Sequence, residues 1–586
     1  MNLFKYLKFY LSILFLIVAL GIFLRSYNFS DWMHFELDQS RDARLISNAY
    51  EKGPGELPLL GPRARGSFLR LGPSFYYFEY LSAKVFGNTP PGMAKSVLIF
   101  SILSLPLFYL LCRRYFGNKI SLISLFIFSI SLFMIMYSRF AWNPNPLPFF
   151  ALLFIYSILR AVDLDDKKKG VWLVVALGSL SIATQMHFLA LIAFPAIAAS
   201  FLLLRRPKIK LRFWMIGVSL AVIFYIPMII NEVKTSGDNG KEFVKVVTER
   251  SEGGESSIFK KAVISYLENS NNYFLILSGK NSSGIVVSGA DETKEISLPI
   301  KKTYSVQYIE NYLVAFLGIV FFSMGILLLA FYLVKEKNSA KKDFLIIVLL
   351  WFIATFGIFT LLAFDLSPRF FLLSAPIPFI FFGFFIKYLY SFHKFSTYLI
   401  SFAVAVLAFS NGNAIKNRFY ELANAGTKPI PISEDPIIKE RARVTFGQEK
   451  KIVEYMESFY FENKYPIFYS ADSQYNPAFK YLLQQDRINF DELNMKRIYE
   501  KGNYFLIKVT KEYEQDLGEY QSKYYDLETK QFGTLTVFRI YPKKEAITAI
   551  EKDFSQPEKK ANSKAPKRYK WGEIFGRLVA EDDDDE

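Results

Sequence analysis

Long apolar segments alternate with short polar stretches over the first 410 residues of the chain. A helix that spans a bilayer needs roughly 20 predominantly apolar residues, and most of the segments approach that length. The pattern therefore predicts about eleven transmembrane helices, although 147–160 and 171–184 are short for a span. The predicted spans lie near 9–25, 93–112, 119–137, 147–160, 171–184, 187–204, 211–230, 311–334, 343–363, 370–389 and 394–410. The fold class that follows is a polytopic α-helical membrane protein.

The loops between the spans differ in charge, and the difference alternates along the chain. One set reads RRYFGNK, DLDDKKKG, RRPKIKLR, KEKNSAKKD and KYLYSFHK, whereas SRFAWNPNP, QMH and FDLSPR hold one basic residue or none. Because cytoplasmic loops carry an excess of Lys and Arg, the first set and the N-terminus are predicted to be cytoplasmic. The basic flank and apolar run at residues 1–25 indicate an uncleaved signal anchor.

The orientation divides the chain into regions. Residues 1–410 are predicted to form the transmembrane domain, with a first outer loop at 26–92 and a large, Gly- and Ser-rich outer loop at 231–310 that is partly mobile. Residues 411–545 are predicted to form a small extracytoplasmic α/β domain, because strand-like YPIFYS, NYFLIKV and TLTVFRIY accompany helix-like EKKIVEYMESFYFE. Residues 546–586 mix charge blocks with Pro and Ser, which predicts a mostly disordered tail.

Composition supports the membrane class and narrows the chemistry. The chain is 52% hydrophobic and 17% aromatic, with a mean hydropathy of +0.20. Its net charge of +16 would suit a nucleic-acid partner, but the Lys and Arg residues gather in short loops, so membrane topology explains the charge and no nucleic acid is predicted. The single cysteine, Cys112, excludes an intrachain disulfide and a cysteine metal site.

A dense charged cluster, FELDQSRDARLI, follows closely on the first apolar segment. In a helix that begins near Asp38, the i, i+3 and i+4 spacing brings Asp38, Arg41 and Asp42 onto one face. Such a helix would lie at the lipid headgroup level with a carboxylate at its start. The plainer alternative is that Asp38 caps the helix and the other charges face water.

The next stretch of the same loop, LPLLGPRARGSFLRLGPSFYYFEYLSAKVFGNTP, combines Gly-Pro turns with basic and aromatic residues. Its candidate substrate contacts are Arg70, Tyr76 and Tyr77, together with Arg41 of the preceding cluster. Aromatic residues are common at membrane interfaces. Carboxylates, arginines and aromatic residues in one outer loop indicate a site for an anionic, sugar-like substrate held at the membrane surface.

These two stretches resemble the first outer loop of bacterial family 39 glycosyltransferases, which are relatives of protein O-mannosyltransferases and of the lipid A aminoarabinose transferase. The resemblance continues in YSRFAWNPNPLPFFALLFIYSIL, QMHFLALIAFP, FYIPMIINEV and LSPRFFLLSAPIPFI, and so covers most of residues 1–410. It implies the GT-C fold, a polyprenyl-phosphate sugar as donor, and an essential aspartate that matches Asp38. Members often have Asp-Glu at that point, whereas this chain has Asp38 and Gln39, so Asp42 or Glu36 would have to supply a second carboxylate.

The metal requirement is left open by the same resemblance. Some relatives use a divalent cation and others do not, and this chain lacks the second acidic residue at Gln39. The SRFAWNPNP loop also lacks the acidic residue of some relatives. A divalent metal with Asp38 as a ligand therefore stays an alternative, and no other cofactor is predicted.

The chemistry of sugar transfer assigns roles to the charged residues. A sugar that leaves a polyprenyl phosphate needs no general acid, because phosphate is already a good leaving group. The acceptor proton needs a base, for which Asp38 is the candidate with Asp42 beside it. The phosphate needs cations as its charge develops. Arg139 and Arg369 suit this role because each is the basic residue of a short outer loop, with headgroup anchoring as the alternative for both.

Polar residues of the other short outer loops complete the set of candidates. Trp142 and Asn143 lie in a Pro-bounded turn and are candidate contacts for the sugar or the acceptor, with a structural turn as the alternative. Gln185 and His187 lie where an outer turn separates two apolar segments, a position at which polar residues are often functional. A histidine that only hydrogen-bonds within the bundle is the alternative for His187.

The sequence as a whole predicts an inverting membrane glycosyltransferase. It would move a sugar from a polyprenyl-phosphate donor to a lipid, glycan or protein acceptor on the outer face of a bacterial cytoplasmic membrane. A transporter or flippase of lipid-linked sugars is one alternative, although that class places charges within spans and shows repeat symmetry. A surface-polysaccharide polymerase or ligase, which uses similar chemistry, is another.

Overall fold

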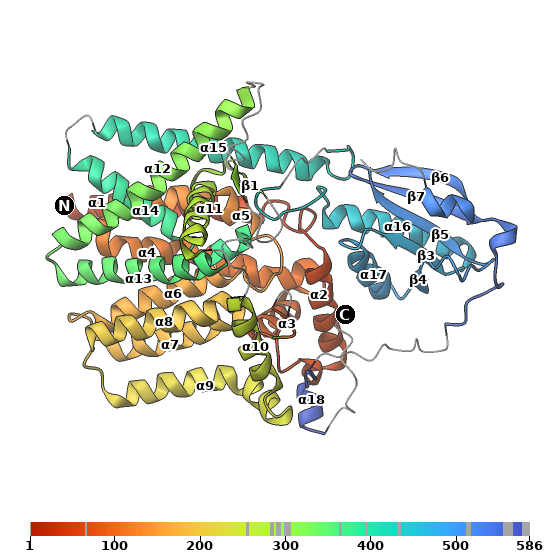
Figure 1. The fold of residues 1–586 in the computed structure, drawn as a ribbon, viewed down its shortest axis with the longest axis horizontal. Helices are drawn as coiled ribbons and strands as arrows, with labels where there is room; N and C mark the ends of the chain where they lie inside the picture. The colour runs from red at the N-terminus through yellow and green to blue at the C-terminus, as the bar shows by residue number, and fades with distance from the viewer. Residues whose placement is uncertain are drawn as a thin grey trace.

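The structure, a computed structural model, consists of a bundle of long helices with an α/β domain at one end (Figure 1). It describes residues 2–64, 67–252, 257–281, 286–288, 295–297, 306–362, 366–392, 396–430, 435–510, 517–554 and 566–576. The helices are α1 (Asn2–Ser26), α2 (Leu37–Lys52), α3 (Ser74–Phe86), α4 (Pro90–Ile130), α5 (Leu132–Met136), α6 (Leu147–Val162), α7 (Lys169–Met186), α8 (Phe188–Arg205), α9 (Leu211–Lys234), α10 (Asp238–Glu252), α11 (Ile258–Ser278), α12 (Val306–Lys335), α13 (Ser339–Leu361), α14 (Ile377–Tyr390), α15 (Ser396–Asn424), α16 (Phe446–Asn463), α17 (Asn476–Gln485) and α18 (Trp571–Ile574). The strands are β1 (Val286–Ser288), β2 (Glu295–Ser297), β3 (Ile467–Ala471), β4 (Phe490–Glu492), β5 (Asn503–Val509), β6 (Tyr524–Phe532) and β7 (Leu535–Pro542).

The predicted apolar segments coincide largely with the helices of the bundle. Within the described ranges, eight helices are long and apolar enough to cross a membrane, and α6 and α14 are shorter apolar helices. Helix α4 contains two predicted spans, because Gly117 (φ 75°) breaks it at the predicted RRYFGNK loop. Glycine adopts such a positive φ at little cost. A multi-pass membrane architecture is therefore confirmed, and the number of spans stays a prediction.

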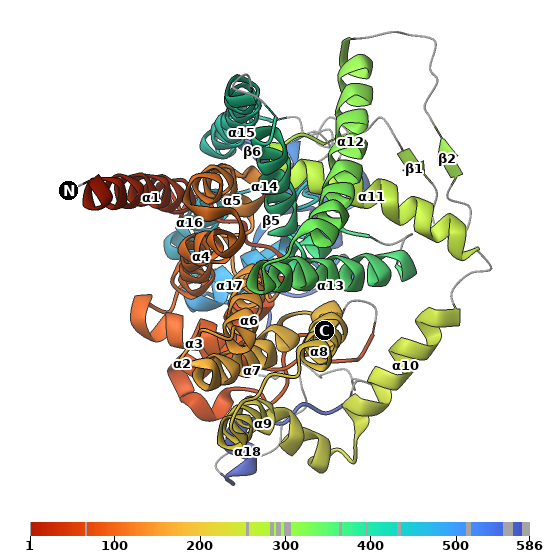
Figure 2. The ribbon, with the colours of Figure 1, turned by 90° about the vertical axis from the view of Figure 1, so that its left-hand side faces the viewer.

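The outermost helices have the exposure expected of lipid-facing spans. Helices α1 and α9 lie at the edges of the bundle when it is viewed toward its N-terminal end (Figure 2). The apolar windows of these two helices are only 17% and 11% buried within the protein. Because side chains such as Phe15 and Val218 would be costly to expose to water, these surfaces fit contact with lipid.

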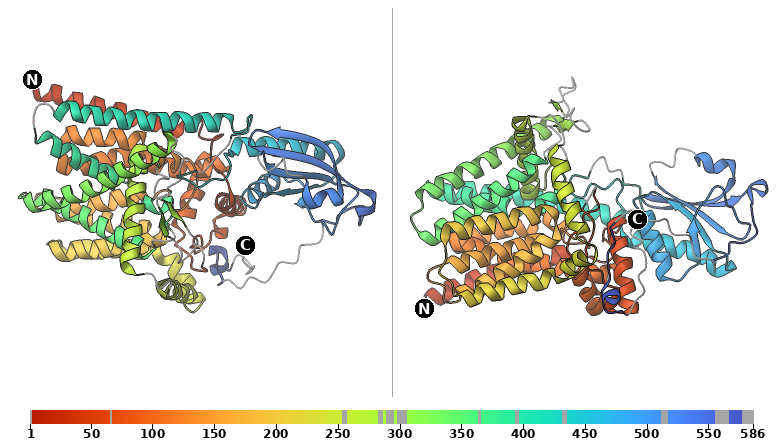
Figure 3. Two further views of the ribbon diagram at one scale, coloured as in Figure 1. Left: turned by 45° about the horizontal axis from the view of Figure 1, so that its top comes forward. Right: turned by 60° about the horizontal axis from the view of Figure 1, so that its bottom comes forward.

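The first outer loop folds into two helices, α2 and α3, at the end of the bundle. Helix α2 lies between the bundle and the α/β domain (Figure 3). It buries Ala43, Ile46 and Ala49, which follow the helical i, i+3, i+6 spacing on one face. The predicted amphipathic helix is thus present, and protein packs against it on both sides.

Between α2 and α3 the chain doubles back on itself over residues 61–72. The Gly61 N–H donates to the carbonyl of Leu71 (2.8 Å), and the Leu71 N–H donates to that of Pro62 (3.0 Å). The two strands approach so closely that a Cβ on Gly61 would lie 2.2 Å from the Gly72 carbonyl oxygen. Glycine is therefore required at this crossing, which explains the paired Gly-Pro turns of the sequence.

The large outer loop differs from the prediction. Instead of a polar, partly mobile stretch, residues 238–252 and 258–278 form helices α10 and α11. Helix α11 buries Ile264, Tyr273 and Ile276 and packs against α12, α13 and α14. Gly and Ser in this region suggested a loop, but burial against the bundle stabilises the helix.

The α/β domain contains a five-stranded sheet of order β4-β3-β5-β7-β6. Strand β3 pairs in parallel with β4 and β5, whereas β7 pairs antiparallel with β5 and β6. Helices α16 and α17 lie on the side of the sheet nearer the bundle (Figure 1), and α17 packs against α2. The predicted strands and the predicted helix are present here.

The C-terminal segment returns to the first outer loop, where a disordered tail was predicted. The Leu59 N–H donates to the carbonyl of Tyr569 (2.8 Å), and the indole of Trp571 donates to the hydroxyl of Tyr77 (2.9 Å). Lys570 forms an ion pair with Glu56 at 2.8 Å. The prediction is therefore wrong for residues 566–576, because backbone pairing and burial of an aromatic ring anchor them; 555–565 and 577–586 lie outside the described residues.

A buried ion network joins the bundle to the α/β domain. Helix α15 continues to Asn424, beyond the predicted domain boundary at 411, and carries Arg418 near its end. Both oxygens of Asp435 accept from Arg418 at 3.1 Å, and Arg443 lies 2.8 Å from the same carboxylate. Although burial opposes ionisation, the two guanidinium groups hold the pKa of Asp435 well below its usual range.

We expect Asp435→Asn to lower the free energy of unfolding by about 3–5 kcal/mol, because it leaves two buried guanidinium groups without their carboxylate. Chemical denaturation in detergent would measure the loss. Since the pKa is lowered on folding, the wild-type contribution is present above about pH 4 and fades as the pH falls below it. Glu528→Gln, in an exposed pair with Arg539 (4.0 Å), should change stability by less than about 1 kcal/mol. Equal losses in the free energy of unfolding for the two substitutions would contradict the stabilising role of the Asp435 network.

Candidate active site

A cavity of about 740 Å³ opens where the first outer loop meets the ends of the bundle helices. Polar, charged and aromatic side chains from distant parts of the sequence line it. The residues that line it are Leu37, Asp38, Arg41, Pro62, Arg63, Ala64, Ser67, Phe68, Leu71, Trp142, Asn143, Pro144, His187, Phe188, Leu189, Glu242, Lys245, Val246, Leu362, Arg369 and Phe370. The cavity therefore contains six of the twelve predicted site residues: Asp38, Arg41, Trp142, Asn143, His187 and Arg369.

Asp38 lies in the first turn of α2 and is held through both of its oxygens. Its Oδ1 accepts from Arg41 Nη1 at 2.9 Å, and its Oδ2 accepts from the indole N–H of Trp142 at 3.1 Å. The side chain keeps 37% of its surface exposed. Since each carboxylate oxygen has two lone pairs, Asp38 retains acceptor capacity toward the cavity while its plane is fixed.

Trp142 connects the carboxylate to a cation. The guanidinium of Arg369 lies over the Trp142 ring, 5.0 Å from its centroid, and 5.4 Å from that of Phe370. A guanidinium is attracted electrostatically to the face of an aromatic ring, which fixes its position. One indole therefore orients both a carboxylate and an arginine on the same cavity wall.

His187 and Asn143 close the wall beside this pair. His187 Nδ1 accepts from the Leu189 N–H (3.2 Å) at the start of α8, and its ring meets Phe370 edge-on at 5.4 Å. Burial and the charge of Arg369 lower the pKa of His187 to about 3, so the imidazole is neutral at physiological pH. Asn143 donates to the Met186 carbonyl at 2.6 Å. Both residues line the cavity and also fix the turn between α7 and α8.

Asp42, predicted to be catalytic, lies behind the cavity wall. It is fully buried, and its Oδ1 accepts from Arg41 Nε (2.9 Å), Arg41 Nη2 (2.8 Å) and the Tyr76 hydroxyl (3.1 Å). Although burial opposes the charge, Asp42, Tyr76 and Asp38 raise the pKa of Arg41 well above its usual range. Asp42 and Tyr76 thus position Arg41, and neither lines the cavity.

The other predicted contacts are also structural. Arg139 is buried and donates to the backbone carbonyls of Arg25 (3.0 Å) and Tyr27 (2.7 Å), which joins α1 to the turn after α5. Arg70 is buried beside Gly61, and its backbone pairs with the Asn239 side chain (2.8 and 3.1 Å). Both residues therefore pack within the protein and do not line the cavity, and the roles predicted for them in binding phosphate and substrate stay predictions.

Gln185 and Tyr77 anchor the first outer loop rather than line the cavity. Gln185 accepts from the Ser74 hydroxyl at 2.7 Å and donates to the Phe224 carbonyl at 3.1 Å, so it ties α3 to α7 and α9. Tyr77 donates to the Pro58 carbonyl at 3.0 Å and accepts from Trp571. The sequence placed both residues near the site, but it could not show that their polar groups are used within the protein.

The cavity also includes charged residues that were not among the predicted site residues. Glu242 and Lys245 come from α10, and Arg63 comes from the loop between α2 and α3. Helix α10 was missed because 231–310 was interpreted as a loop. The alternation of apolar Phe243 and Val246 with charged neighbours was the available signal for an amphipathic helix.

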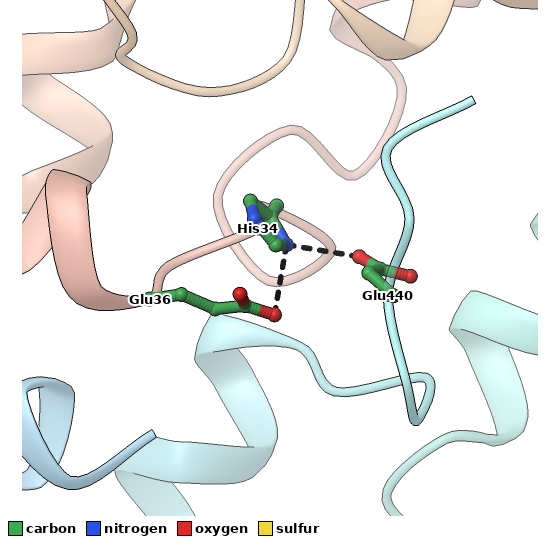
Figure 4. A group of neighbouring side chains, drawn as sticks. All are labelled: His34, Glu36 and Glu440. Atoms are coloured by element: carbon green, nitrogen blue, oxygen red, sulfur yellow. Dashed lines mark hydrogen bonds and ion pairs between the residues drawn. The ribbon is translucent and has the colours of Figure 1, made fainter. Parts of the chain in front are cut away.

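Among the described residues, one group of three side chains has an arrangement suited to a metal ion: His34, Glu36 and Glu440. Their ligand atoms lie within 4.8 Å of one another (Figure 4). Asp38, the candidate metal ligand from the sequence, is not part of this group. Glu36, considered as the second carboxylate, faces His34 and does not line the cavity.

Comparisons with known proteins agree with this architecture. A family model for dolichyl-phosphate-mannose-protein mannosyltransferases matches residues 71–230. The crystal structure of ArnT from Cupriavidus metallidurans in the apo state has a TM-score of 0.50 at 9% identity and covers 92% of this chain and 98% of that one. The same enzyme bound to undecaprenyl phosphate has a TM-score of 0.51 at 10% identity, with 91% and 98% covered.

A more distant similarity is to the Archaeoglobus fulgidus oligosaccharyltransferase tethered to an acceptor peptide, with a TM-score of 0.46 at 14% identity and coverage of 92% and 74%. A search of curated proteins found no match to the sequence. The shared fold rests on ArnT, which this chain matches over nearly the whole of both structures. The chain therefore has the fold of ArnT, and its residues 71–230 match the family model for dolichyl-phosphate-mannose-protein mannosyltransferases.

Proposed function

We propose that this protein transfers a sugar from a polyprenyl-phosphate donor to an acceptor hydroxyl, and that the reaction takes place in the cavity bounded by Asp38 and Arg369. The observation that carries the proposal is the shared indole of Trp142, which holds a carboxylate and a guanidinium on one wall of that cavity. A base and a phosphate-binding cation are the two groups that this transfer requires. The undecaprenyl phosphate bound to ArnT supports the class of donor.

In the proposed reaction Asp38 accepts the proton of the acceptor hydroxyl as its oxygen attacks the anomeric carbon. The bond between that carbon and the phosphate oxygen breaks, and the electron pair leaves with the phosphate. Arg369 stabilises the charge that develops there, with Arg63 and Lys245 also lining the cavity. Direct displacement by one attacking group inverts the anomeric configuration.

The arrangement of the bundle supports an outer-face site in a bacterial cytoplasmic membrane. The N-terminus lies at the end of the bundle opposite the α/β domain (Figure 1). Ion pairs between Arg114 and Asp163 and between Arg205 and Asp343 join loops of the basic set to one another. We infer that this basic end is cytoplasmic, which places the cavity and the α/β domain outside.

We expect Asp38→Asn to reduce sugar transfer by about 10²- to 10⁴-fold, because it removes the general base but keeps the shape of the side chain. The assay would follow a labelled sugar from polyprenyl-phosphate donors in proteoliposomes, at equal protein content. Glu51→Gln, an exposed acid on the same helix, is the matched control and should leave the rate unchanged. Wild-type transfer by the Asp38 variant would overturn the assignment of the base.

Arg369→Gln tests the phosphate role. A hydrogen bond to a charged group contributes about 1.5–3 kcal/mol, so the Kd for undecaprenyl phosphate, measured by intrinsic fluorescence, should rise about 10- to 150-fold. Arg497→Gln, an exposed arginine of the α/β domain, should bind as the wild type does. Unchanged affinity in Arg369→Gln would show that the phosphate lies elsewhere.

Trp142→Phe separates the two contacts of the indole. The ring face under Arg369 is retained, but the N–H that binds Asp38 is lost. We expect kcat to fall about 3- to 10-fold, the cost of roughly 1 kcal/mol for one hydrogen bond, with little change in the Kd for undecaprenyl phosphate. Trp142→Leu should impair both quantities, and an equal loss of donor affinity in the two variants would refute the division of roles.

A further inference from the structure

His34, Glu36 and Glu440 meet where the first outer loop contacts the linker that leads into the α/β domain (Figure 4). His34 Nδ1 lies 2.9 Å from Glu440 Oε1 and 3.5 Å from Glu36 Oε1. Ligands about 2.0–2.1 Å from a tetrahedral zinc ion lie about 3.3 Å from one another. The two separations from His34 are close to this spacing, and the Glu36 and Glu440 oxygens lie within 4.8 Å of each other.

The second oxygen of each carboxylate is already engaged by a protein donor. Gln474 donates to Glu36 Oε2, and Arg443 forms an ion pair with Glu440 Oε2. The His34 ring is fixed edge-on against Phe140, with centroids 4.9 Å apart. Outer contacts that orient ligating carboxylates and imidazoles in this way are typical of metal sites. They leave one oxygen of each carboxylate directed toward His34.

A further acidic side chain is buried close to Glu36. Glu449 is completely buried, and neither of its carboxylate oxygens has a hydrogen-bond partner within the described part of the chain. Its charge interacts with that of Glu36. The nearest arginine, Arg443, is shared with Asp435 and Glu421 as well as Glu440. Burying carboxylates close together is costly, and a cation bound to Glu36 would reduce that cost.

We propose that His34, Glu36 and Glu440 bind one divalent metal ion, and that the ion links the first outer loop to the α/β domain. One imidazole nitrogen and two carboxylate oxygens form a donor set that suits Zn²⁺, with Mn²⁺ as the weaker fit. The three side chains are buried or nearly so, and none of them lines the cavity. The ion therefore has a structural and positioning role.

Glu36 links the proposed metal site to the helix that carries Asp38. Glu36 immediately precedes α2, and Asp38 follows two residues later in the first turn of that helix. An ion bound to Glu36 and to Glu440 would fix the start of α2 against the linker of the α/β domain. The proposal does not depend on glycosyl transfer, because it is tested by the metal content of the protein.

The test measures metal content in the full-length protein purified in detergent. The protein is stripped with a chelator, incubated with Zn²⁺ alone, passed through a desalting column and analysed by mass spectrometry of the metal. We expect about one Zn²⁺ per wild-type chain and a loss of at least 10-fold in His34→Ala and in Glu36→Gln. Glu454→Gln, an exposed acid on α16, should retain the wild-type content. Wild-type protein without zinc, or variants that keep it, would overturn the proposal.

A second set of measurements uses only the wild-type protein, so it does not depend on whether a variant folds. Wild-type protein loaded with Co²⁺ should show visible absorption bands characteristic of nitrogen and oxygen ligation, and Zn²⁺ should abolish them by competition. Zn²⁺ should also raise the midpoint of thermal unfolding of the wild type, since a ligand that binds only the folded state stabilises it. Absence of both the Co²⁺ bands and the thermal shift would show that the cluster is an ion-pair contact only.

Discussion

The carboxylate of Asp38 is held through one oxygen by Arg41 and through the other by Trp142, and the rest of the site is arranged around that contact. Arg41 is itself fixed by the buried Asp42, so residues of α2 alone hold one oxygen of Asp38 in place. Trp142 extends the support to Arg369 across the cavity wall. A carboxylate that is partly exposed and held in one orientation can accept a proton without having to rearrange during the reaction.

Support for α2 comes from the α/β domain as much as from the bundle. The Phe446 N–H donates to the Met33 carbonyl (2.9 Å), and Ser47 on α2 contacts the Tyr481 hydroxyl (3.1 Å) on α17. The Asp435 network holds the connection between α15 and this domain in place. The α/β domain is therefore part of what positions α2 and its Asp38.

The sequence predicted the features that depend on local spacing, and it failed where long-range packing decides. The i, i+3, i+4 pattern correctly placed Asp38, Arg41 and Asp42 on one helix, but it could not show that Asp42 is fully buried and accepts from the Tyr76 hydroxyl. Arg139 has the loop position of a phosphate ligand, yet its two terminal nitrogens donate to backbone carbonyls at the end of α1. The Arg139 contacts join residues more than 100 positions apart and the Tyr76–Asp42 contact joins residues 34 apart, separations that no helical or strand periodicity records.

The two walls of the cavity differ in a way that bears on specificity. One wall consists of helix ends and tight turns that carry Asp38, Trp142, His187 and Arg369, each with a defined partner. The other consists of residues 62–64, 67 and 68 together with helix α10, and its Arg63, Glu242 and Lys245 carry charges of both signs. Transfer chemistry requires the first set to stay fixed. If Asp38 and Arg369 have the roles proposed above, substitutions in the second set change the charge that faces an acceptor without disturbing either residue.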